Sequence, residues 1–232
     1  MKILALDTST MMTTCAVIDG DRLVGEYSLS QDMTHSEKLV PMIGEVLDNL
    51  SFNIDDIDLY GVAIGPGSFT GLRIGVSTIK AFAHLFDKPV VGVSTLEALG
   101  YNLPYNDIVV PMIDARRDRV YTAIYSWENG EFKEIMAPDV LPIEDILERL
   151  DDYNRISING NGGSIYRDTI LDRLNNRVQF APIGQNTCRA VSIAELAKLK
   201  YKAGIVDDYF TLAPDYLRQS QAQRELNKSF RK

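Results

Sequence analysis

The chain has 232 residues, 45% of them hydrophobic and 24% charged, which is ordinary for a globular protein and enough for one large core or two modest ones. Its formal net charge of −8 disfavours strong stand-alone binding of nucleic acid, because an acidic surface repels a phosphate backbone. Two cysteines, no signal-peptide pattern and no apolar run near the roughly 20 residues of a membrane span favour a cytoplasmic protein without a disulfide framework.

The first hundred residues alternate between runs typical of strands and runs typical of helices. The strand-like runs span 2–7, 13–19, 22–28, 59–64 and 89–93. The helix-like runs, with apolar residues three and four apart, span 35–50, 70–86 and 94–102. Three successive strands, followed by alternating helices and strands, predict a mixed sheet with helices packed on it.

A glycine-rich stretch, GPGSFTGLRIG at 65–75, joins the fourth of these strands to the second helix. It lacks the lysine and hydroxyl residue of a Walker loop and the G-x-S-x-G order of a nucleophile elbow. Gly65 and Gly67 allow a tight turn, and Gly71 and Gly75 lie on one helix face. Each helical glycine loses about 1 kcal/mol of helix propensity relative to alanine, which the close approach of another backbone would explain. We therefore expect close packing here, without a bound phosphate.

From about residue 103 the pattern partly restarts, which predicts a second half similar to the first. The stretch 108–125 lies over 3–18 with Asp114 on Asp7, and both copies read strand, aspartate, polar turn, strand. Further helix-like or strand-like runs follow at 142–152, 155–160 and 190–204.

Two subdomains of similar build are therefore expected, one at 1–102 and one at 103–218. The last helix-like run belongs to the second range but is able to pack back on the first half. The tail 219–232 is polar, and we expect it to be partly disordered. Two duplicated α/β domains, each with a strand–Asp–turn–strand unit facing a common cleft, are the build of the actin-like ATPase and sugar-kinase superfold.

This superfold makes four residues candidates for a nucleotide site: Asp7, Asp114, Gly160 and Gly162. A carboxylate at a strand end can hold Mg²⁺ through water, while hydroxyl residues after it meet nucleotide phosphates. The glycines of GNGG follow a strand, where such folds place an adenosine. The competing interpretation is that each aspartate caps its own turn and the glycines only form a loop. An ATP-dependent phosphotransferase or ATPase is the alternative function that these residues support.

Four stretches together resemble the TsaB (YeaZ) family: ILALDTST, HSEKLVPMI, AIGPGSFTGLRIGVSTIKAF and VVGVSTLEAL. The resemblance implies a non-catalytic subunit, without a cofactor of its own, in the synthesis of threonylcarbamoyladenosine next to the anticodon of tRNA. It implies that the partner is a TsaD-type catalytic subunit and that a TsaE-type ATPase joins the complex. It also implies that the isolated chain is able to form a homodimer and that it meets tRNA only through the complex. The candidate nucleotide residues are then vestigial.

The resemblance also implies that the first two helices pair with the TsaD-type subunit. The apolar candidates for this contact are Leu39, Met42, Ile43, Val46, Leu72, Val76 and Ile79. For each of them, a place in the core under the sheet is the competing interpretation.

No metal site is expected. The two histidines, His35 and His84, lack a histidine three or four residues away or a nearby cluster of carboxylates. The TsaD family carries an H-x-x-x-H metal-binding pair, and the resemblance lays Thr95 and Leu99 on those two positions. Leucine has no ligand atom and the threonine hydroxyl is a poor ligand, so the glycopeptidase activity of older family names, which needs that metal, finds no support.

Overall fold

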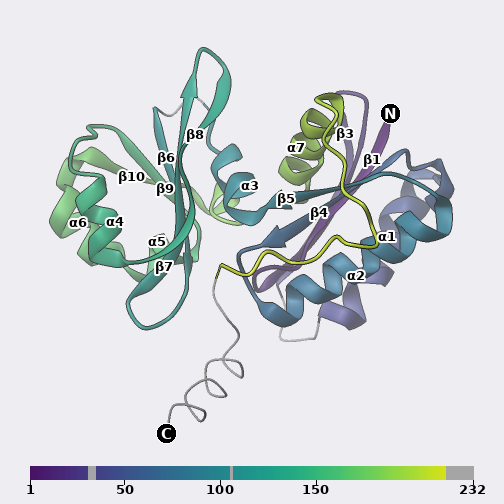
Figure 1. Ribbon diagram of the computed structural model, residues 1–232, viewed down its shortest axis with the longest axis horizontal. Helices are drawn as coiled ribbons and strands as arrows, with labels where there is room; N and C mark the ends of the chain where they lie inside the picture. The colour runs from purple at the N-terminus through teal and green to yellow at the C-terminus, as the bar shows by residue number, and fades with distance from the viewer. Residues whose placement is uncertain (31–34, 105–106, 218–232) are drawn as a thin grey trace, which may run out of the picture.

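The computed structural model describes residues 1–30, 35–104 and 107–217 and folds them into two α/β units side by side (Figure 1). The first unit has a five-stranded sheet in the order β3-β2-β1-β4-β5. Its strands are β1 (Lys2–Asp7), β2 (Met12–Asp19), β3 (Arg22–Ser30), β4 (Leu59–Gly65) and β5 (Val90–Ser94). β1 is antiparallel to β2 and parallel to β4, so the sheet is mixed, as the sequence pattern predicts.

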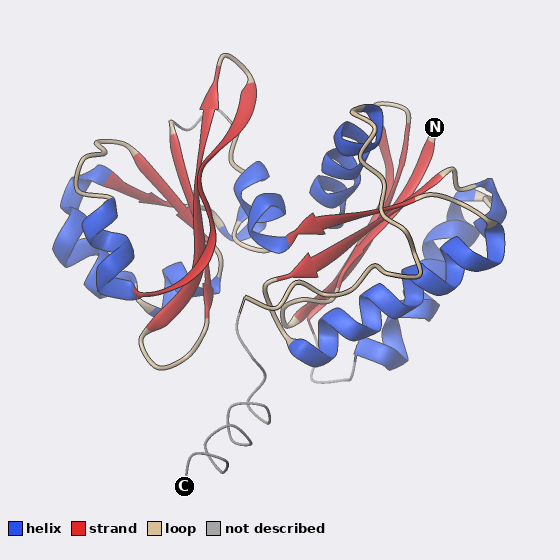
Figure 2. Cartoon of the chain, viewed as in Figure 1, coloured by secondary structure: helices blue, strands red, loops and turns tan. Residues whose placement is uncertain are grey.

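Helices cover both faces of this first sheet (Figure 2). The helices α1 (His35–Leu50) and α2 (Phe69–Phe86) lie on one face, the helix α7 (Ala190–Lys202) lies on the other, and a 3-10 turn, η1 (Ile54–Asp56), precedes β4. Alternate residues of a strand point to opposite faces, so Leu4 and Leu6 pack with α1 and α2 while Ile3 and Ala5 pack with α7. β1 is buried on both sides, which explains its continuous apolar run.

The second unit repeats the strand order of the first, as β8-β7-β6-β9-β10. Its strands are β6 (Ile108–Asp114), β7 (Arg119–Glu128), β8 (Glu131–Pro142), β9 (Ile156–Asn159) and β10 (Val178–Phe180). Its helical elements are α4 (Ile143–Arg149), α5 (Asn161–Ile165), α6 (Arg167–Leu174) and the 3-10 turns η2 (Asn175–Arg177) and η3 (Ile183–Gln185). β6 is antiparallel to β7 and parallel to β9, as β1 is to β2 and β4. The predicted duplication is confirmed.

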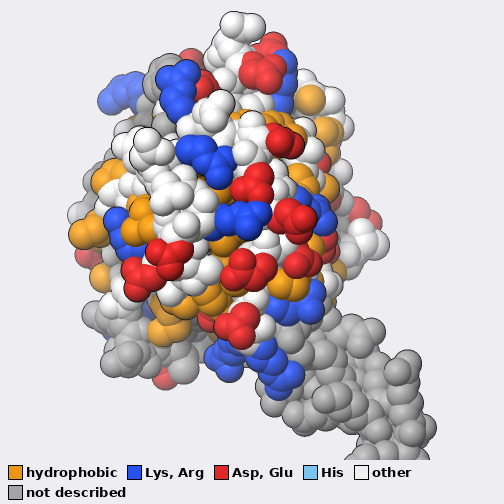
Figure 3. Space-filling model, turned by 90° about the vertical axis from the view of Figure 1, so that its left-hand side faces the viewer, with side chains coloured by type: hydrophobic (Ala, Val, Ile, Leu, Met, Phe, Trp, Pro, Cys, Tyr) orange, Lys and Arg blue, Asp and Glu red, His pale blue; other side chains and the backbone are white. Residues whose placement is uncertain are grey.

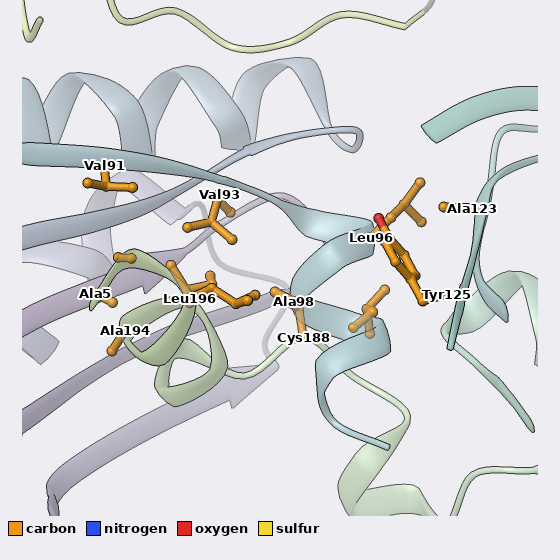
Figure 4. Close-up of a cluster of buried hydrophobic side chains, with 14 of the residues drawn as sticks. Ala5, Val91, Val93, Leu96, Ala98, Ala123, Tyr125, Cys188, Ala194 and Leu196 are labelled. Atoms are coloured by element: carbon orange, nitrogen blue, oxygen red, sulfur yellow. The ribbon is translucent and has the colours of Figure 1, made fainter. Parts of the chain in front are cut away.

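A short helix, α3 (Thr95–Tyr101), joins the two units, because its apolar side chains lie between the first sheet and β7 (Figure 4). Leu96 of α3 belongs to the same buried cluster as Val93 of β5 and Leu196 of α7. The same cluster includes Ala123 and Tyr125 of β7. A continuous apolar core therefore connects the units.

The end of the described chain returns to the first unit. α7 packs on β1, β2, β4 and β5, and Asp207 N donates to Val90 O at 2.9 Å beside β5. The expected second subdomain, 103–218, thus includes a segment, 190–217, that packs on the first unit. The physical reason is that α1 and α2 cover only one apolar face of the first sheet, and α7 covers the other. The tail 219–232 lies outside the described residues.

Some elements escape the sequence patterns. β8 is an edge strand whose charged residues and Pro138 obscure its alternation, and the short helices α5 and α6 carry few apolar residues. Pro41 lies inside α1, which runs from His35 to Leu50 as expected. Among the described helices, none combines the length and the apolar character needed to cross a bilayer.

Candidate functional site

Two aspartates end equivalent strands of the two units, Asp7 on β1 and Asp114 on β6. Asp7 Oδ1 accepts a hydrogen bond from Ser9 N at 2.7 Å, and Asp114 Oδ1 accepts one from Arg116 N at 2.9 Å. Both carboxylates therefore cap the turn two residues further on, which is one of the two interpretations that the sequence leaves open. Asp7 is fully buried, whereas Asp114 is partly exposed and accepts a longer hydrogen bond from the Tyr166 hydroxyl.

The enclosed Asp7 carboxylate lies beside the buried thiol of Cys188. Burial raises the pKa of Cys188 well above its ordinary value, and the charge of Asp7 and a hydrogen bond to it raise that pKa further. The thiol therefore stays protonated and donates to the carboxylate. Because Mg²⁺ in nucleotide sites keeps several of its waters, a carboxylate with no surface accessible to water does not fit the role of holding this ion.

The glycines of the 65–75 stretch fit against the turn that follows β1. A Cβ atom at Gly67 would overlap Ser9 O, and a Cβ atom at Gly71 would overlap Thr8 O. A Cβ atom at Gly75 would lie 2.6 Å from Thr8 Oγ1, which is too close for two heavy atoms that are not hydrogen-bonded. The loop and α2 therefore reach this turn at a distance that only glycine permits.

Hydrogen bonds join the same two segments. Ser68 N donates to Ser9 O at 2.6 Å, and Thr8 Oγ1 donates to Gly71 O at 2.7 Å. Ser68 Oγ accepts from Gly71 N and so caps the start of α2. Gly65 has φ +119°, and a Cβ atom there would lie 2.7 Å from the backbone oxygen of Asp215. The contacts of the loop with its own chain thus account for its composition without a phosphate.

The glycines of GNGG are likewise engaged by packing. Gly160 has φ +90°, and a Cβ atom there would overlap Met112 O on β6. A Cβ atom at Gly162 would lie 3.0 Å from the same oxygen, and Gly160 N donates to Asn186 Oδ1 at 2.9 Å. These glycines let α5 begin directly against β6.

A small cavity remains between the units. It measures about 130 Å³, and residues from both units line it, among them Thr10, Leu99, Ile113, Gly160 and Cys188. Sites for drug-sized ligands usually enclose about 300–1,000 Å³. This cavity by itself is therefore smaller than an ordinary nucleotide site.

The two positions aligned with a metal-binding pair, Thr95 and Leu99, lie one turn apart in α3 and are both buried. Their setting is apolar, and the backbone oxygen of Leu99 accepts a hydrogen bond from Asn159 Nδ2 at 2.7 Å. Within residues 1–30, 35–104 and 107–217, the structure has no group of three or more His, Cys, Asp or Glu side chains that could hold a metal ion.

The apolar residues predicted to contact a partner are buried in the monomer: Leu39, Met42, Ile43, Val46, Leu72, Val76 and Ile79. All of them except Leu72 pack with the strands of the first sheet in one cluster. The structure therefore corrects this choice of residues, because covering the sheet takes up the most apolar stripe of each helix. Only the opposite side of α1 and α2 is open to a partner.

That open side carries residues that the sequence analysis did not single out. Its exposed residues are Ser36, Glu37, Val40, Pro41, Glu45, Asp48 and Asn49 of α1, and Thr70, Arg73, Ser77, Ala81, His84 and Leu85 of α2. The sequence pattern that identifies them is their spacing, since they lie on the helix side opposite to the apolar residues that repeat three and four apart. Charge differs between the helices, since α1 carries three exposed acids and Lys38, whereas α2 carries Arg73 and Lys80 and no acid. Val40 stands out as an apolar side chain that is 53% exposed.

Comparison with known proteins agrees with this architecture. A family model described as TsaD: tRNA N6-adenosine threonylcarbamoyltransferase matches residues 22–226. A Bacillus subtilis (strain 168) protein named tRNA threonylcarbamoyladenosine biosynthesis protein TsaB is 33% identical over 225 residues, which cover 96% of each chain. The structure of YeaZ from Pseudomonas aeruginosa matches with a TM-score of 0.79 and 26% identity, over 93% of this chain and 99% of that one.

A more distant likeness concerns the fold alone. Component A of the Acidaminococcus fermentans (R)-2-hydroxyglutaryl-CoA dehydratase matches with a TM-score of 0.54 and 12% identity, over 87% of this chain and 99% of that one. The duplicated five-stranded sheets facing a common cleft are those of the actin-like ATPase and sugar-kinase superfold. With a full-length relative, a matching family model and a common fold, the chain belongs to the TsaB (YeaZ) family, whose domain is of the TsaD type.

Proposed function

We propose that this protein acts in tRNA threonylcarbamoyladenosine biosynthesis as a non-catalytic subunit that pairs with a TsaD-type catalytic subunit. A TsaE-type ATPase joins this complex, which transfers the threonylcarbamoyl group to the adenosine next to the anticodon. The observation that carries the proposal is that Asp7, the acid at the end of β1, has no exposed surface and contacts Ser9 N and the Cys188 thiol. An acid closed off in this way is not placed to hold a hydrated metal ion, which supports a subunit without chemistry of its own at this strand end.

The open side of α1 and α2 supports pairing with a subunit of the same fold. A partner related by an approximate two-fold axis would lay its second helix over α1 of this chain and its first helix over α2. In a self-associated pair, which we expect to be possible in isolation, this would bring the acids of one copy toward the exposed Arg73 of the other. Complementary charge of this kind favours the correct partner and orientation.

The charge of the protein supports contact with tRNA through the complex and not by this subunit alone. On the outer face of the second unit, acidic and basic side chains are interspersed (Figure 3). Together with the net charge of −8, this gives little attraction for a phosphate backbone. The proposal places the protein in the cytoplasm with its tRNA substrate.

The proposal is tested by reconstituting tRNA modification from the TsaD-type and TsaE-type subunits with and without this chain. We expect modification only when the chain is present, and retention of the chain on immobilised TsaD-type subunit. The substitution Asp7→Asn should leave modification intact in a preparation that still pairs. ATP turnover by the isolated chain with Mg²⁺, or loss of modification in a correctly paired Asp7→Asn complex, would contradict a non-catalytic role.

A further inference from the structure

One segment of the first unit, residues 207–216, runs along α2 from its C-terminal end to its N-terminal end (Figure 1). We call it the strap. Near its start, the Tyr209 ring lies 5.4 Å from the His84 ring, and at its end the Tyr216 ring stacks on Phe69 at 4.6 Å. Fifteen residues separate Phe69 from His84, which is about 22 Å of helix. The strap therefore flanks α2 over most of its length.

The first part of the strap is fixed to the edge of the first sheet. Asp207 N donates to Val90 O at 2.9 Å, and Asp207 Oδ2 accepts from Gly92 N at 2.7 Å. These bonds satisfy backbone groups of β5, which is the last strand at this edge. The strap is thus paired with the sheet and is not a loose chain end.

Its middle and end are fixed as well. Leu212 is buried in the cluster under α2, and Lys80 Nζ donates to the backbone oxygens of both Phe210 and Leu212. Asp215 N donates to Ile64 O at 2.7 Å. The backbone on both sides of Phe210 is therefore held in place by buried or hydrogen-bonded contacts.

Large apolar side chains nevertheless point to solvent from this fixed backbone. Phe210 is 69% exposed and Leu85, at the end of α2, is 73% exposed. The Phe210 ring lies 4.5 Å from the Tyr209 ring and 5.6 Å from the His84 ring, so it belongs to an ordered aromatic group. Exposed aromatic groups on rigid backbone are typical of protein contacts, because little conformational entropy is lost when a partner covers them.

We infer that Leu85, Tyr209 and Phe210 form a third part of the surface that contacts the TsaD-type subunit, beside α1 and α2. The inference rests on the proposed function. α2 has α1 on one side and the strap on the other, so a partner laid over the exposed residues of α2 reaches the strap. The strap is also bonded directly to α2. Arg73 Nε donates to the Tyr216 hydroxyl, and Lys80 Nζ donates to the backbone oxygen of Leu212.

The test compares the affinity of purified TsaD-type subunit for three variants of the full chain. We expect Phe210→Ala and Leu85→Ala each to weaken binding about ten-fold or more, as truncated aromatic and apolar anchors do, and Phe210→Leu to lose much less. The matched control is Ile183→Ala, which removes an apolar side chain that is 92% exposed on the second unit and should change affinity less than two-fold. Thermal unfolding should be unchanged in all of them.

The outcomes separate this inference from the proposed function. If Val40→Arg on α1 weakens pairing while Phe210→Ala and Leu85→Ala bind like the unaltered chain, the strap is not a contact and the proposed function stands. If the strap variants change only self-association of the isolated chain, the inference is also wrong. If the unaltered chain does not bind the TsaD-type subunit at all, both the inference and the proposed function fail.

Discussion

Helix α2 passes so close to the turn after β1 that a methyl group at position 71 would overlap Thr8 O. The substitution Gly71→Ala should therefore force the helix away and lower the free energy of unfolding by about 1–3 kcal/mol. Gly44, inside α1, is the matched control, because a Cβ atom there meets nothing within 4 Å. Gly44→Ala should stabilise the protein by up to about 1 kcal/mol through helix propensity. Urea denaturation of the two variants checks the contrast, and equal midpoints would contradict it.

A second residue-scale prediction concerns Cys15, a free thiol on β2. Burial, followed by the charge of Glu26, raises the pKa of Cys15 to about 12 from an ordinary 9.0. Between these two values the unfolded chain loses the thiol proton while the folded chain keeps it. The free energy of unfolding should therefore fall as pH rises through this window, by up to about 1.4 kcal/mol per pH unit for this group.

The measurement is urea denaturation from about pH 8 to about pH 11 for the unaltered chain and for Cys15→Ala. Other buried groups, such as Tyr101, whose pKa burial raises to about 12, still titrate in the variant. The free energy of unfolding of the variant should therefore fall less steeply with rising pH than that of the unaltered chain, but it should still fall. Parallel curves for the two proteins would show that Cys15 does not titrate as its burial requires.

At the scale of the element, the two sides of α1 should respond oppositely to the same substitution. Val46 is buried under the sheet and Val40 is 53% exposed on the open side. Val46→Arg buries an unpaired charge and should cost on the order of 3–5 kcal/mol of stability. Val40→Arg should change stability by no more than about 0.5 kcal/mol while it weakens pairing with the TsaD-type subunit.

Thermal unfolding followed by circular dichroism, together with a binding assay, checks this pair of α1 variants. A Val46→Arg protein that folds but fails to bind would show that the apolar residues of α1 contact the partner, as the sequence analysis predicted. A Val40→Arg protein that binds normally would move the contact to another part of the open side.

At the scale of the whole molecule, the apolar core around α3 should make the two units unfold together. Leu96 is fully buried between Val93 of the first unit and Tyr125 of the second. Leu96→Ala should cost about 2–5 kcal/mol and lower the midpoint of both units at once. Trp127, the single tryptophan, reports on the second unit by fluorescence, while far-ultraviolet circular dichroism reports on both. Separate midpoints for the two probes would contradict one cooperative transition.

Local patterns in the sequence were enough to predict much of the fold. The run KILALD gave β1, the apolar spacing from His35 to Leu50 gave α1, and the partial restart near residue 108 gave the duplication. The edge strand β8 escaped prediction, because its charged residues and Pro138 obscure the alternation of its apolar residues. The glycine stretch identified the family and the close packing of α2, but not the atoms that approach it.

What the sequence by itself determined is most of the elements of the first unit, the repeated topology and the poor ligand chemistry of Thr95 and Leu99, because these depend on residue type and local spacing. Only the tertiary structure decided that Asp7 is shut off from water, that the apolar stripes of α1 and α2 face inward, and that the last helix and the strap return to the first unit. Burial and contact depend on which distant segments cover each surface, and no local pattern of residues specifies that.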